Sequence, residues 1–67
     1  MNHLIDTPNL ADHDGFYAEL LSAHAGLNDR QSQALNAQLI LILANHVGDR
    51  QVLTEALALA RQGVDQR

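Results

Sequence analysis

The residues of this chain most capable of chemistry are its histidines and the acidic residues beside them. His13 stands between Asp12 and Asp14, and His46 lies near the end of a long apolar segment. If the flanking helices are antiparallel, these four residues approach one another and become candidate ligands of a metal ion or a pH-sensitive corner. Their spacing matches no known ligand motif, and two imidazoles with flexible aspartates make a poorly preorganised site. We therefore expect no bound metal, and we expect His46 to pack against residues 8–17.

His24 and His46 each fall on an apolar helical stripe, so both are expected to point inward. His24 lies on the stripe that includes Phe16 and Leu20. Imidazoles in such positions are commonly satisfied by hydrogen bonds rather than used as ligands. We expect the ring nitrogens of the inward-facing histidines to bond the backbone or an amide side chain such as that of Asn45.

The segment Asp12-His13-Asp14-Gly15 invites comparison with a calcium-binding loop. When Gly15 is aligned with the loop's invariant glycine, Leu10 falls at the first ligand position and Leu21 falls where a bidentate glutamate belongs. Calcium binding by this motif is therefore excluded. The aspartates are better explained as anions that favour a helix N-terminus.

No sequence motif indicates an enzyme. The chain has no glycine-rich phosphate loop, no Gly-x-Ser-x-Gly elbow and no His-Glu-x-x-His pair. A chain of 67 residues also has little room for a pocket of about 300 Å³ or more. We expect a non-catalytic protein without a cofactor.

The charge distribution argues against nucleic-acid binding. The net charge is −4, and the only four cations are scattered arginines at positions 30, 50, 61 and 67. Binding to the phosphates of nucleic acids requires clustered Lys and Arg. The net negative charge of this chain would instead repel them. The absence of cysteine removes disulfides, thiolate metal sites and cysteine nucleophiles.

Hydropathy gives no indication of export or membrane insertion. The first residues have no basic segment followed by an apolar run of signal-peptide length. The longest purely apolar stretch, residues 39–44, is far shorter than the ~20 residues that cross a bilayer. A cytoplasmic protein that does not contact membranes is the expectation.

Glycines and capping residues divide the chain into three helices. Gly26, Gly48 and Gly63 each follow a run with helical apolar spacing and are interpreted as helix stops. Asn28 and Asp49 are suitable N-caps for the second and third helices, and Asp12 or Asp14 can cap the first. Ala and Leu dominate, and no segment alternates apolar and polar residues over the length of a strand.

The fold class predicted from these signals is all-α, a helical hairpin plus a third helix, completed by dimerisation. Helices are predicted near residues 13–25, 29–47 and 50–62. The expected organisation is an extended N-terminal lead-in over residues 1–11, a single helical domain over residues 12–63, and a flexible C-terminus over residues 64–67.

The second predicted helix carries a wider apolar surface than one neighbouring helix can cover. Leu35, Leu39 and Ile42 line one side of it, and a second side lies about 100° away. Its own flanking helices could cover both sides, or a second copy of the chain could. Because the outer helices are short and rich in alanine, we predict a homodimer. The predicted interface residues are Leu39, Ile40, Leu43 and Val47.

Several short blocks of the chain resemble a known family. They are Asn9-Leu10-Ala11-Asp12, Asp14-Gly15-Phe16-Tyr17, Ala23-His24, Gly26-Leu27, Leu35-Asn36-Ala37 and Leu43-Ala44-Asn45-His46-Val47-Gly48-Asp49. The chain is similar, over residues ~9–60, to short proteobacterial proteins classified as a domain of unknown function. The resemblance defines no functional residues. It implies an accessory role, because such proteins are often encoded beside flavin-dependent aromatic hydroxylases.

Two hypotheses of different classes follow from the sequence. The first is a small helical interaction or accessory protein that self-associates, with a flavin-dependent aromatic hydroxylase as a candidate partner. The alternative is a metal- or ligand-binding helical module that uses the histidines. The wide apolar surface favours the first hypothesis, and the number of histidines favours the second.

Overall fold

Three helices account for most of the chain. The computed structural model describes residues 3–65, and residues 1, 2, 66 and 67 lie outside the described residues. Helix α1 spans His13–Ala23, α2 spans Asp29–Val47 and α3 spans Arg50–Asp65. No strand occurs within residues 3–65, so the all-α prediction is confirmed. No helix in this described part is long and apolar enough to cross a membrane.

Side-chain caps begin each helix where the sequence predicted. The carboxylate of Asp12 accepts a hydrogen bond from the Gly15 amide at 3.0 Å. Asn28 and Gln31 form a reciprocal capping box, with bonds of 2.9 and 3.1 Å between each side chain and the other's amide. Asp49 accepts from the amides of the first turn of α3, including that of Val52 at 3.3 Å. These bonds satisfy amides that have no partner within the helix.

Two of the three glycines predicted to stop helices do so. Gly26 and Gly48 have φ angles of +79° and +66°, in the left-handed region that closes helix ends. Helix α1 ends at Ala23, two residues before the predicted end, and a turn leads to Gly26.

Gly63 is not a stop, and this prediction is wrong. It lies inside α3, which continues to Asp65. An interior glycine costs a helix only about 1 kcal/mol, and an Arg61–Asp65 ion pair with an N–O distance of 3.0 Å spans the position. Residues 64 and 65, predicted to be flexible, are therefore helical, and residues 66 and 67 of that segment are outside the described residues.

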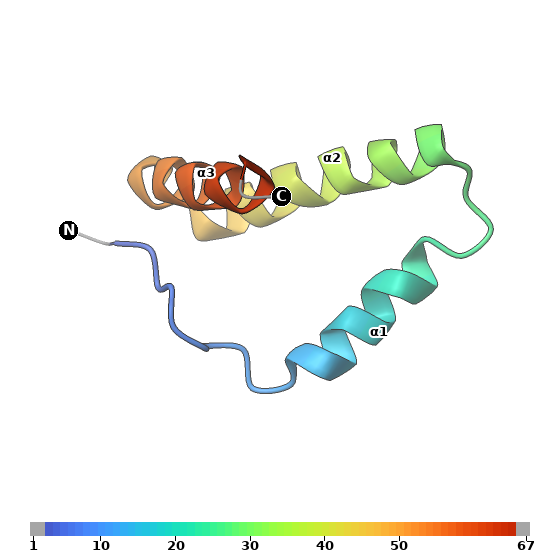
Figure 1. Cartoon of the computed structure of the whole chain (residues 1–67), viewed down its shortest axis with the longest axis horizontal. Coiled ribbons are helices and arrows are strands. Elements are labelled where there is room, and N and C mark those ends of the chain that lie inside the picture. Colours follow the sequence, from blue (N-terminus) through green and yellow to red (C-terminus); the bar gives the residue numbers. More distant parts are fainter. Residues whose placement is uncertain (1–2, 66–67) are drawn as a thin grey trace.

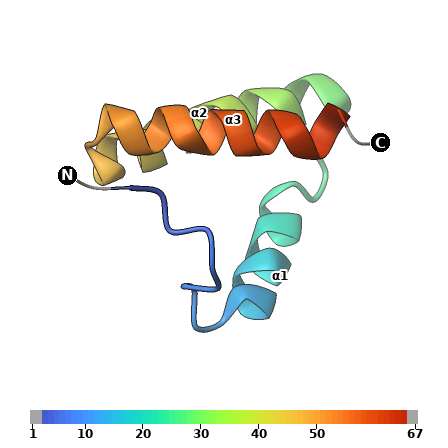
Figure 2. The ribbon, with the colours of Figure 1, turned by 60° about the vertical axis from the view of Figure 1, so that its left-hand side comes forward.

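The helices are arranged as an open frame rather than a closed bundle. Helices α2 and α3 run antiparallel beside each other, whereas α1 diverges from α2 after the turn at Gly26 (Figures 1 and 2). No Cα atom of α1 comes within 8 Å of one of α2. The predicted hairpin of the first two helices thus opens into a V, and the closer pair is α2 with α3.

The described part of the chain forms no buried hydrophobic core. Among residues 3–65, no side chain is fully buried. The accessible surface is 6102 Å², whereas a compact monomer of 7.3 kDa exposes only ~4,200 Å². The radius of gyration is 13.5 Å, compared with ~11 Å expected for a compact domain of this length. Many large apolar side chains remain exposed, among them Leu41, Ile42 and Leu57.

Candidate functional site

The four candidate metal ligands do not converge on one point. His13 and Asp14 lie side by side at the exposed start of α1, with 3.4 Å between Nδ1 and Oδ1. Asp12 is engaged in capping the same helix. His46 is exposed at the far end of α2. Residues 3–65 contain no group of three or more His, Cys, Asp or Glu residues that could hold a metal ion.

The predicted packing of His46 against residues 8–17 is also wrong. That prediction required α1 to return alongside α2, but the two helices separate toward the start of α1 (Figure 1). The end of α2 therefore has no partner in α1.

His24 behaves as an inward-facing histidine was expected to behave. Its Nδ1 lies 2.8 Å from the Leu20 carbonyl oxygen, which can only accept, so Nδ1 donates in this bond. Its Nε2 lies 3.0 Å from the side-chain oxygen position of Asn36 in α2. In the neutral ring, Nε2 accepts a hydrogen bond when the Asn36 amide turns its NH₂ group toward the ring. His24 thus ties the end of α1 to α2.

Glu55 anchors the N-terminal lead-in to α3. Its carboxylate accepts from the Leu4 amide at 3.0 Å and lies 3.3 Å from His3 Nδ1 and 3.5 Å from Gln51 Nε2. These groups favour the charged carboxylate, the Leu4 amide most of all, and they lower the pKa of Glu55 below its usual 4.5. Sequence reasoning missed this contact, since no local pattern links residues 51 positions apart.

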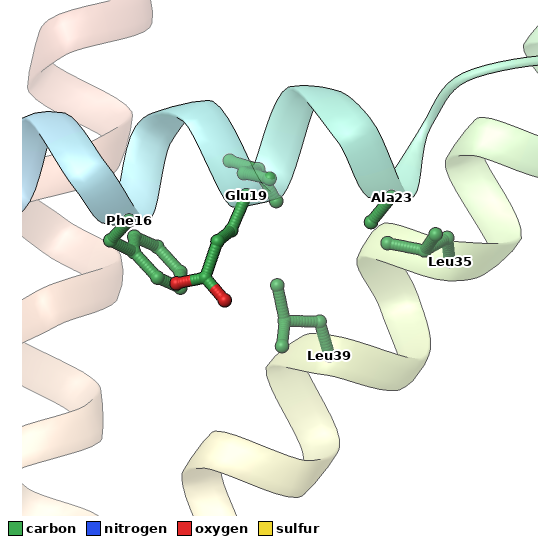
Figure 3. Close-up of a pocket in the computed structure, with 6 residues that line it drawn as sticks. Phe16, Glu19, Ala23, Leu35 and Leu39 are labelled. Atoms are coloured by element: carbon green, nitrogen blue, oxygen red, sulfur yellow. The ribbon is translucent and has the colours of Figure 1, made fainter.

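A shallow cleft occupies the angle between α1 and α2. Its walls are Phe16, Leu20 and Ala23 of α1 and Leu35 and Leu39 of α2, which face each other across a volume of about 270 Å³ (Figure 3). Glu19 also lines the cleft. An open space of this size, lined mainly by hydrocarbon, has no convergent polar groups to orient a reacting molecule.

A second, larger groove lies between α2 and α3, with a volume of about 380 Å³. None of its lining residues is polar. They are Ile40, Ala44, Leu53, Ala56, Leu57 and Ala60. We call this surface the α2–α3 groove.

Two of the four predicted interface residues line these surfaces, one on each, and the other two line neither. Leu39 lines the cleft and Ile40 lines the α2–α3 groove. Leu43 and Val47 are exposed, at 49% and 46% of their full accessible areas. Helix α2 therefore presents apolar side chains to both surfaces, and the structure leaves its wide apolar arc largely uncovered.

The chain matches a known family model. A model described as "Protein of unknown function (DUF2783)" matches residues 4–62, which is most of the chain. No curated protein and no solved structure matches.

Proposed function

Since this chain belongs to the family described as Protein of unknown function (DUF2783), which carries no assigned activity, we propose a function from its surfaces. We propose that it is a small, non-catalytic helical interaction protein that self-associates. A second copy completes the core that one chain lacks.

One observation carries this proposal, namely that residues 3–65 include no buried side chain. Folding is driven mainly by burial of apolar surface, at about 25 cal/mol per Å², and it must offset a large loss of conformational entropy. A chain of 67 residues without cysteine has no disulfide to compensate. Association is the remaining source of burial, and large exposed apolar surfaces usually mark interfaces.

The proposal predicts that folding and association are coupled. The purified chain should sediment as a dimer at micromolar concentration, and its urea midpoint should rise with protein concentration because only the native state contains two chains. Analytical ultracentrifugation and circular dichroism test this. A monomeric, cooperatively folded chain at high micromolar concentration would refute the proposal.

We further propose a flavin-dependent aromatic hydroxylase as the enzyme partner, on the family resemblance described above. The α1–α2 cleft is the surface available for this enzyme if a second copy covers the α2–α3 groove. Titration calorimetry with a hydroxylase encoded beside this protein tests the pairing, with Phe16→Asp as the variant expected to abolish binding. Equal affinity of wild type and variant would exclude the cleft, and no binding at all would exclude this partner.

A further inference from the structure

We infer that the α2–α3 groove is where two copies of this chain meet, each α2–α3 pair packing face to face with the other as a four-helix bundle. This inference rests on the proposed self-association and specifies its surface. The interface predicted from sequence was centred on α2 alone, whereas α3 provides four of the six residues that line this surface.

The groove is complementary to itself in side-chain size. Three alanines, Ala44, Ala56 and Ala60, leave space between the two helices, while Ile40 and Leu57 stand beside them with 62% and 70% of their areas exposed. In a two-fold contact, the same patch meets itself, so large side chains of one copy can occupy the spaces beside the alanines of the other. Interdigitation of this kind is how antiparallel helix pairs pack into four-helix bundles.

The distribution of charge favours the same face. The chain has a net charge of −4, so two copies repel unless their acidic groups stay apart. No residue lining the groove is ionisable. Glu55 of α3 is two residues from Leu57, or about 160° around the helix axis at ~100° per residue, and it is engaged with the lead-in. The α1–α2 cleft, by contrast, includes Glu19.

The area that two copies must bury to become compact is that of an obligate dimer. Two separate chains expose 6102 Å² each, whereas a compact particle of twice the mass exposes only ~6,900 Å². The difference, ~5,000 Å², lies at the upper end of the area buried in permanent homodimers. Burial of about this area between two copies would bring the exposed surface to that of an ordinary compact protein.

Two isoleucines on α2 provide a matched test. Ile40 and Ile42 are 62% and 63% exposed, but they lie about 160° apart around the helix, and only Ile40 lines the groove. We expect Ile40→Asn to weaken the dimer about 100-fold or more, because two copies of the side chain lose burial. Ile42→Asn should change the dissociation constant by less than about threefold, as surface substitutions do. Sedimentation equilibrium measures both.

Single cysteines keep the inference testable even if Ile40→Asn fails to fold. The natural chain has no cysteine, so any disulfide formed by a single-cysteine variant must join two copies. We expect mild oxidation to give covalent dimers from at least one of Ala44→Cys, Ala56→Cys and Ala60→Cys, but not from the cleft control Ala23→Cys.

The outcomes separate this inference from the proposal on which it rests. A monomeric wild type would overturn both. If the wild type is a dimer but the Ala23→Cys variant cross-links, or none of the groove variants does, the groove is not the interface. Self-association would still stand. A dimer with equal dissociation constants for the Ile40 and Ile42 variants would do the same.

Discussion

Glu55 shows how one residue connects distant parts of a loosely packed chain. Its carboxylate contacts the Leu4 amide and the His3 ring, so the start of the described lead-in is held at α3, while its other end continues into α1. Each of these hydrogen bonds lies near solvent, where a hydrogen bond contributes only modestly to the stability of the fold. Together they nevertheless favour the charged form of the carboxylate.

Acid should therefore release the lead-in. The folded-state pKa of Glu55 lies below its usual 4.5, so the stabilisation is present above that value and is lost as pH falls through the folded-state pKa. We expect the Leu4 amide to be protected from hydrogen exchange at pH 7 and to lose protection in acid. Glu55→Gln should lower its protection at neutral pH, whereas Gln51→Ala, which removes only the 3.5 Å bond, should change it little. Full protection in Glu55→Gln would contradict this role.

At the scale of an element, helix ends depend on backbone conformations that most residue types rarely adopt. Gly48 closes α2 with φ +66°, and its amide bonds the Ala44 carbonyl at 2.9 Å. Gly63 lies in ordinary helical conformation with nothing within 4 Å of an added Cβ. The two glycines should therefore respond oppositely to substitution.

We expect Gly48→Val to destabilise the protein by about 1 kcal/mol or more, because a β-branched residue is strained at positive φ. Gly63→Ala should stabilise it by about 0.5–1 kcal/mol, since alanine loses less backbone entropy in a helix. Urea denaturation at a fixed protein concentration measures both changes. Stabilisation by Gly48→Val would show that the turn between α2 and α3 is built differently.

At the scale of the whole molecule, an acidic chain associating through an uncharged groove has a characteristic salt dependence. Two copies of net charge −4 repel over a screening length of ~30 Å at 0.01 M salt, which shrinks to ~3 Å at 1 M. The dimer should therefore become tighter as sodium chloride is raised, as measured by sedimentation equilibrium at pH 7. A dimer that weakens with salt would indicate an interface built on ion pairs instead.

The sequence by itself determined the helices of this protein. Asn28 with Gln31, Asp49 with Val52, and the positive φ of Gly26 and Gly48 act over three or four residues, so their types and spacing were enough to place most helix ends. Gly63 misled the prediction because glycine permits a stop without requiring one.

Only the tertiary structure decided how the helices are placed. The angle at Gly26 opens α1 away from α2, which separates His46 from His13. It also places Leu39 in a cleft, whereas its neighbour Ile40 lines a different surface, the α2–α3 groove. The contact between Leu4 and Glu55 spans 51 positions and follows from that arrangement. How helices pack against one another depends on small differences between the apolar surfaces that each arrangement buries. The pattern of a helix specifies which of its faces is apolar, but it does not specify which segment covers that face.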